Sequence, residues 1–179
     1  MIDRVLVVCV GNICRSPMAQ ALLAQRLGSV VVESAGTEAL IGQGADPLAM
    51  SLMHEREIDI HAHRARQLAA WMAEAADLVL VMDHRQKRYI ERRFASLYGR
   101  VYLLGPACGK DGPSATRCEI PDPYRKDRAS FEQALALIEA GVEEWYARIS
   151  RVFTNVSTLA LSSNYSSSPS ASKEPDFSS

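Results

Sequence analysis

The sequence lacks both a hydrophobic run long enough to cross a bilayer and a surplus of charge of one sign. The apolar stretch at residues 5–10 is far shorter than the roughly 20 residues that a membrane helix needs. Lys and Arg number 20 against 21 Asp and Glu, so the formal net charge is −1. A near-neutral chain has no electrostatic footprint for nucleic acid or an anionic membrane. We therefore expect neither nucleic-acid binding nor direct membrane insertion.

The sequence also has few cysteines and lacks the pattern of a secretory signal peptide, because its first apolar stretch directly follows Asp3 and Arg4. We therefore expect a cytoplasmic protein whose thiols stay reduced. The cysteine spacings do not resemble a zinc site, and neither a metal nor a cofactor is implied. The cysteines are Cys9, Cys14, Cys108 and Cys118.

Apolar runs alternate with helical patterns along most of the chain. Its 179 residues suit one domain with a sizeable core, and strand, helix and strand at the start indicate a right-handed βαβ unit. We expect a three-layer, doubly wound α/β domain with a four-stranded parallel sheet flanked by helices, and a site at the carboxyl end of the first strand. The predicted strands are residues 4–8, 29–33, 77–82 and 101–104, and the predicted helices are residues 17–27, 46–55, 66–73, 83–94 and 130–149.

Two segments lack a regular pattern. Residues 35–46 are rich in glycine and predict a loop beside the site. Residues 152–179 are dominated by serine, which indicates disorder. We therefore divide the chain into a folded domain, residues 1–151, and a Ser-rich tail, residues 152–179.

The predicted helix at residues 83–94 is charged and mostly exposed. Its basic residues would suit nucleic acid, but the overall charge is near zero, so we interpret this face as a solvated surface. The basic residues are Arg85, Lys87, Arg88, Arg92 and Arg93.

A short loop, residues 9–17, joins the first apolar run to the first helical pattern. We expect Ser16 as the N-cap of that helix and Pro17 as its first residue. A loop between a buried strand and a helix directs backbone N–H groups and the positive helix end at one spot. Such a spot suits a tetrahedral oxyanion.

Cys9 and Arg15 flank this loop and give it chemistry. The N–H groups, the helix end and the guanidinium favour the nucleophilic thiolate form of Cys9, and the planar fork of Arg15 matches two phosphate oxygens. Gly11 and Asn12 tolerate the backbone angles of a tight loop, and Ser16 is able to donate a hydrogen bond to sulfur. Alternatively, Cys9 is a small apolar residue that closes a buried strand. The predicted phosphate-binding loop comprises Val10, Gly11, Asn12, Ile13, Cys14, Arg15 and Ser16.

Residues 8–17, Val-Cys-Val-Gly-Asn-Ile-Cys-Arg-Ser-Pro, resemble the signature of the low-molecular-weight protein tyrosine phosphatases. Further blocks of this family are matched in order at residues 33–37, 63–67 and 122–125, and the resemblance spans about residues 3–150. Residues 42–47 and 118–126 look most like the bacterial exopolysaccharide and capsule branch.

The resemblance implies a two-step reaction through a phosphocysteine on Cys9. The first step expels a phenolate that needs a proton, and the family likeness implies that Asp122 supplies it and later activates water as a base. Asp122 stands between Pro121 and Pro123, which stiffen its loop, although Asp-Pro alone is also a common turn. Tyr124 then lines the cleft and stacks on an aromatic ring.

Four further residues receive roles from the same resemblance. Ser34 and His63 are implied to hydrogen-bond Asn12 and hold the loop in shape. Leu40 is implied to line the substrate cleft, while a loop apolar residue also commonly packs against its own domain. Cys14 either forms a reversible disulfide with the nucleophile or merely packs.

The sequence therefore predicts a protein tyrosine phosphatase. Its partner, by resemblance, is a phosphotyrosine protein, namely a tyrosine autokinase that drives exopolysaccharide production. Two alternatives stay open: an arsenate reductase of the same fold, and a non-catalytic phosphate-binding module. The reductase needs closely spaced relay cysteines that Cys108 and Cys118 do not provide. A module that only binds has no need of both Cys9 and Asp122.

Overall fold

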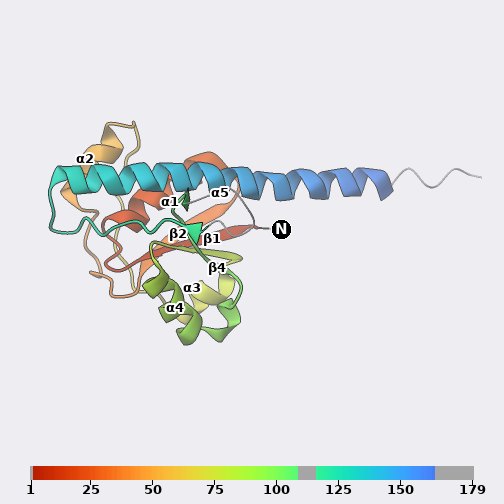
Figure 1. Ribbon diagram of the computed structural model, residues 1–179, viewed down its shortest axis with the longest axis horizontal. Coiled ribbons are helices and arrows are strands. Elements are labelled where there is room, and N and C mark those ends of the chain that lie inside the picture. The colour runs from red at the N-terminus through yellow and green to blue at the C-terminus, as the bar shows by residue number, and fades with distance from the viewer. Residues whose placement is uncertain (1, 109–115, 164–179) are drawn as a thin grey trace, which may run out of the picture.

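A computed structural model describes residues 2–108 and 116–163 and places a parallel sheet between two layers of helices (Figure 1). The four strands follow the order β2-β1-β3-β4, and every neighbouring pair is parallel, which confirms the predicted fold class. The strands are β1 Arg4–Cys9, β2 Val31–Gly36, β3 Leu78–Val81 and β4 Val101–Leu103, and the helices are α1 Arg15–Leu27, α2 Pro47–His54, α3 Ala70–Ala75, α4 His84–Arg93 and α5 Arg128–Ser163, with a 3-10 turn η1 at Ala95–Leu97.

Strand β1 lies inside the sheet and is covered on both faces. Val5, Val7 and Cys9 belong to the core beneath α1, α2 and α5. Leu6 and Val8 belong to the core beneath α3 and α4, which lie on the opposite side of the sheet (Figure 1). A strand buried on both faces has no polar side, which explains why an unbroken apolar run encodes it.

Several helix ends agree with the sequence. Asp46 caps α2 by accepting a hydrogen bond from the Leu48 N–H, and Asp83 caps α4 by accepting one from the Gln86 N–H. Helix α1 ends at Gly28, whose φ of 55° favours a residue without a side chain.

The start of α1 differs from the prediction. The helix begins at Arg15 with Cys14 as its N-cap residue, so the prediction of Ser16 as the N-cap was wrong. The Ser16 hydroxyl is instead engaged with the Cys9 sulfur and the Asn12 side chain. A side chain committed to the site is not free to cap its own helix.

The predicted helix at residues 66–73 was also wrong in its first half, because α3 begins only at Ala70. The Arg66 N–H donates to the Asn12 side-chain oxygen, and Gln67 forms a parallel bridge with Gly36. These contacts hold residues 66–67 extended against the phosphate-binding loop. The local sequence does not predict them.

Helix α5 is longer than the sequence predicts. It continues to Ser163, and its last turns project beyond the sheet (Figure 1). No proline or glycine follows Gly141 until Pro169, so nothing in the sequence stops the helix near residue 149. The rest of the predicted tail, residues 164–179, lies outside the described residues, and the division of the chain at residue 152 stays a prediction. Across residues 2–108 and 116–163, no helix combines the length and the apolar character needed to cross a membrane.

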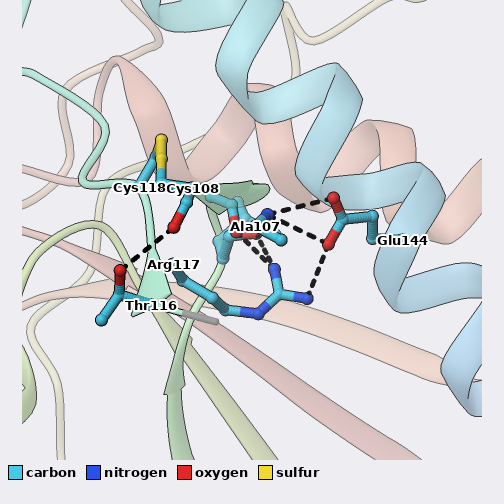
Figure 2. The surroundings of a disulfide bond; sticks show 8 residues. Ala107, Cys108, Thr116, Arg117, Cys118 and Glu144 are labelled. Carbon is cyan, nitrogen blue, oxygen red and sulfur yellow. Dashed lines mark hydrogen bonds and ion pairs between the residues drawn. A yellow bond between two sulfur atoms is a disulfide. The ribbon is translucent and has the colours of Figure 1, made fainter. Parts of the chain in front are cut away.

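A two-stranded antiparallel ribbon, which the sequence did not predict, lies beside α5. Its strands are β5 Ala107–Cys108 and β6 Thr116–Arg117. Figure 2 shows a disulfide between Cys108 and Cys118, whose Cα atoms are 5.2 Å apart, and Arg117 reaching Glu144 of α5 at 3.1 Å. The expectation that all four thiols stay reduced was therefore wrong for this pair. It rested on the expected compartment, whereas the ribbon brings the two sulfurs together.

Gly141 lies where α5 crosses the end of β4, and it has no room for a side chain. A Cβ there would lie 2.2 Å from the carbonyl oxygen of Leu104 and 3.2 Å from the Cα of Gly105. Replacing a helical glycine by alanine normally stabilises a protein by about 0.5–1 kcal/mol. We expect Gly141→Ala to lower the free energy of unfolding by about 2 kcal/mol instead, because the obstacle is backbone that cannot rotate away.

Urea unfolding followed by circular dichroism measures this change. Gly44→Ala is the matched control, since the nearest atom that its Cβ would meet belongs to the flexible Arg64 side chain at 3.8 Å. A gain in stability for Gly141→Ala would contradict the tight crossing of α5 over residues 104–105.

Candidate active site

The predicted phosphate-binding loop lies at the carboxyl end of β1 and opens into a hollow of about 210 Å³. Helix α1 begins within the loop, so the positive end of the helix faces the hollow. The hollow brings together residues that are far apart in the sequence: Cys9, Val10, Gly11, Ile13, Cys14, Arg15, Glu38, Leu40, Asp122 and Tyr124.

The carbonyl groups of five successive loop residues, 9–13, all accept hydrogen bonds from outside the loop. In a trans peptide the N–H of the next residue points the opposite way from the carbonyl. The N–H groups of residues 10–14 therefore point inward and form a nest for an anion. The five donors are the backbone N–H groups of Thr37, Glu38, Leu40 and Asp46 at 2.8–3.0 Å, and the His63 ring at 2.7 Å.

The Cys9 sulfur lies within this nest and is held by two donors. The Asn12 N–H points at Sγ from 3.2 Å, and the Ser16 hydroxyl lies 2.9 Å from it. Ser16 Oγ already accepts a hydrogen bond from Asn12 Nδ2 at 2.8 Å, so its own hydrogen is available to the sulfur. Hydrogen bonds donated to sulfur favour the thiolate over the thiol.

Asn12 fixes the shape of the loop through every polar atom of its side chain. It adopts a left-handed backbone with φ of 55°, and it is fully buried. Its Nδ2 donates to Ser16 and to Ser34 (2.9 Å), while its Oδ1 accepts from the Arg66 N–H (2.9 Å). The Ser34 hydroxyl in turn donates a hydrogen bond to Gln20 Oε1 at 2.6 Å. With all donors and acceptors assigned, the amide has one orientation.

His63 holds the same residue from the other side. Its Nε2 lies 2.7 Å from the Asn12 carbonyl oxygen, and a carbonyl only accepts, so Nε2 carries the hydrogen. Burial lowers the pKa of His63, and this outweighs the opposing effect of the Asn12 carbonyl. The ring is therefore neutral at neutral pH and acts as a fixed donor. Ser34 and His63 both contact Asn12 as the sequence analysis expected.

Arg15 connects the loop to the segment that carries Asp122. The residue is 2% exposed. Its Nη1 donates to the Ile120 carbonyl at 3.0 Å, and its Nη2 contacts the Asp122 carboxylate. Its Nε is buried and has no hydrogen-bond partner among residues 2–108 and 116–163. A buried guanidinium with an unused donor beside an anion nest is a suitable partner for a phosphate oxygen.

Asp122 stands at the rim of the hollow, with its side chain 45% exposed. Its Oδ1 accepts the Tyr124 N–H at 3.1 Å, and both residues line the hollow. The preceding Ile120 is fully buried, and its N–H donates to the Met82 carbonyl at the end of β3. This contact anchors the Asp122 segment to the sheet.

Leu40 and Cys14 complete the wall beside the nucleophile. Leu40 is partly buried, packs against the core and also lines the hollow, so both readings of this residue describe it. Cys14 is a free, buried thiol, as is Cys9. Burial, followed by the charge of Asp46, raises the pKa of Cys14 far above its usual range. Cys14 therefore stays protonated and does not compete as a nucleophile.

Sequence reasoning missed two residues that support the site. Gln20 accepts the Ser34 hydrogen bond, and the Arg66 side chain donates to the Ser34 carbonyl at 2.8 Å. Arg66 lies within the recognised block at residues 63–67, but its role depends on tertiary contacts. A lone glutamine on an amphipathic helix gives no signal of its own.

Comparisons with known proteins agree with this geometry. Residues 4–155 match the family described as low molecular weight phosphotyrosine protein phosphatase. The chain is 50% identical over 149 residues to a probable low molecular weight protein-tyrosine-phosphatase EpsP of Ralstonia solanacearum, covering 83% of this chain and 97% of that protein. It is 42% identical over 148 residues to the phosphatase Wzb of Escherichia coli K12, covering 81% and 94% of the two chains. The solved structure of Vibrio vulnificus Wzb in complex with benzylphosphonate matches with a TM-score of 0.75 at 32% identity, covering 83% of this chain and 99% of that one.

Proposed function

Because this chain belongs to the low molecular weight protein tyrosine phosphatase family, in its exopolysaccharide and capsule branch, we propose that it hydrolyses phosphotyrosine in two steps through a phosphocysteine on Cys9. The observation that carries this proposal is the position of the Cys9 sulfur. It lies within the N–H nest, hydrogen-bonded by Ser16 and Asn12, while Asp122 stands at the rim of the same hollow.

In the first step the Cys9 thiolate attacks phosphorus. The S–P bond forms, the bond from phosphorus to the tyrosine oxygen breaks, and Asp122 gives its proton to the leaving phenolate. The inward N–H groups of residues 10–14 and the Arg15 guanidinium hold the three equatorial oxygens throughout. These donors are in place before the reaction, so little reorganisation is needed at the transition state.

Asp122 must carry a proton for this role, although it contacts Arg15. An entering phosphate dianion competes for the Arg15 fork and brings negative charge close to the carboxylate. Both changes weaken the contact that holds the Asp122 carboxyl group against Arg15 and free it to face the leaving oxygen. Substrate binding thereby prepares the acid.

In the second step water attacks the phosphocysteine on the side that the phenol has left. Asp122, now ionised, takes a proton from the water, the S–P bond breaks, and inorganic phosphate forms. Ser16 donates its hydrogen bond to the departing thiolate. The enzyme returns to its starting state with no redox change and no group left on it.

The names of the relatives support a proposal for the biological substrate. EpsP and Wzb are named as tyrosine phosphatases, and the benzylphosphonate in the Vibrio structure is a benzyl group joined to a phosphonate. An aromatic ring joined to phosphate suits the hollow here, whose wall includes Leu40 and Tyr124. The substrate we propose is the phosphotyrosine of a tyrosine autokinase that drives exopolysaccharide production.

Hydrolysis of p-nitrophenyl phosphate and of a phosphotyrosine peptide by the wild-type protein, with a metal chelator present, tests the proposal. We expect turnover of both, and a phosphorylated protein on rapid quench that is stable to hydroxylamine, as an S–P bond is and an acyl phosphate is not. If the protein binds phosphate without turnover, it is a binding module. Thiol-dependent reduction of arsenate in place of hydrolysis would reassign it as a reductase.

A further inference from the structure

Helix α4 presents a basic face that the catalytic mechanism does not use. Its exposed residues recur at positions i, i+3, i+4 and i+7, which place them on one side of the helix, while Gln86 and Ile90 face the core. Lys87 pairs with Glu91, and Arg93 lies over the Phe94 ring. Within the described part of the chain, none of the four arginines of this helix forms an ion pair. The basic face consists of Arg85, Arg88, Tyr89, Arg92 and Arg93.

This basic face is continuous with the active site. A second hollow, of about 460 Å³, shares Arg15 and Asp122 with the catalytic hollow and extends to Arg85 and Tyr89. A further hollow also includes Arg85 and Tyr89 and extends along α4. A polypeptide whose phosphotyrosine fills the catalytic hollow therefore has an open path onto the arginines.

Charge along this path changes sign with distance from the catalytic site. The Asp83 carboxylate accepts the Gln86 N–H as the N-cap of α4, and the Glu119 carboxylate accepts the His84 N–H at 2.9 Å. Glu38 is exposed and lines both hollows, so it repels an anion close to the phosphotyrosine. Beyond Arg85 every charged residue that lines the path is an arginine.

We propose that the basic face of α4 binds an acidic segment of the phosphoprotein substrate. In the substrate, this segment is separated from the phosphotyrosine by the residues that lie beside Glu38. This inference rests on the proposed function, because the phosphotyrosine bound in the catalytic hollow determines which substrate residues reach α4. Arg85 and Arg92 are seven residues apart, about 10 Å along the helix, which matches about three residues of extended peptide. The fork of arginine suits carboxylates. The net charge of −1 favours this local partner over nucleic acid or an anionic membrane.

Three phosphotyrosine peptides of equal length test the proposal. One has neutral flanks, and two carry a run of glutamates beyond the residues next to phosphotyrosine, one on each side. We expect kcat/KM to be about tenfold higher for one acidic peptide than for the neutral one, as several exposed charge pairs allow. Arg88→Gln with Arg92→Gln should reduce this preference to about twofold through KM, as should high salt.

The matched control is Arg148→Gln with Arg151→Gln, which removes the same charge from α5 on the opposite side of the sheet (Figure 1). It should keep the preference. Neither double variant should change hydrolysis of p-nitrophenyl phosphate, which is too small to reach α4. Calorimetric binding of the peptides to Cys9→Ser, with and without the α4 substitutions, provides a readout that does not depend on turnover.

Equal kcat/KM and equal affinity for the three peptides would overturn the docking proposal even if the enzyme is fully active. So would an equal loss for acidic and neutral peptides in the α4 variant. Binding of duplex DNA or phosphatidylserine vesicles that depends on Arg88 and Arg92, without peptide preference, would assign the face to that partner instead. Failure of the proposed function appears separately, as the absence of p-nitrophenyl phosphate hydrolysis while the peptides still bind.

Discussion

Cys9→Ser is expected to lower kcat for phosphotyrosine peptides by about four orders of magnitude or more. Serine is nearly the same size and keeps a polar atom beside Ser16 and Asn12. Its hydroxyl, however, is almost wholly un-ionised at neutral pH, and the site contains no base in contact with it. The hydrogen-bond partners of Cys9 Sγ are the Ser16 hydroxyl and the Asn12 N–H, and the Cys14 thiol that lines the same hollow stays protonated. The nest therefore still binds the phosphoryl group but lacks a nucleophile.

Steady-state kinetics, phosphate binding and thermal unfolding together check this result. The variant should bind inorganic phosphate and unfold within a few degrees of wild type, because the carbonyl contacts that shape the loop come from four backbone N–H groups and the His63 ring, and none involves the Cys9 side chain. Retention of substantial turnover in Cys9→Ser would exclude the phosphocysteine route. Loss of phosphate binding together with activity would mean that the substitution had disturbed the nest.

The sequence was most informative where local chemistry and packing agree. The run at β1 is apolar because both faces are covered, and Asp83 caps α4 with a contact three residues away. Parallel strands also bring their carboxyl ends to one edge of a sheet. This is why Cys9 and the segment around Asp122, which follows the last strand of the sheet, meet although 113 positions separate them.

The sequence was least informative where long-range contacts outweigh local preference. Arg66 and Gln67 have side chains that favour a helix, yet their backbones pair with Asn12 and Gly36. The ribbon of β5 and β6 has only two residues in each strand, too few for a periodic pattern. Gln20 gains its role only when β2 places Ser34 beside it. In each case the deciding partner lies at least eight residues away.

Asp122→Asn is expected to lower kcat for phosphotyrosine peptides by about two to three orders of magnitude. Asparagine keeps the shape and the oxygen that accepts the Tyr124 N–H, but it has no proton to give to a phenolate. The loss should shrink for p-nitrophenyl phosphate, because its more acidic phenol leaves without help. With that substrate the second step becomes limiting, since the variant also lacks the base that activates water. A burst of p-nitrophenol and an accumulated phosphocysteine should then appear on rapid quench.

The dependence on leaving group separates chemistry from structure. Asp122 contacts the Arg15 guanidinium, so asparagine also removes an ion pair at the rim of the hollow. If the role of Asp122 were purely structural, kcat would fall by the same factor for both substrates, and no burst of p-nitrophenol would appear. Asp59→Asn, the same change at an exposed residue bonded to His61, should alter neither rate. An equal loss for the two substrates would therefore place Asp122 among the residues that position Arg15 and leave the proton donor to be found elsewhere along the rim.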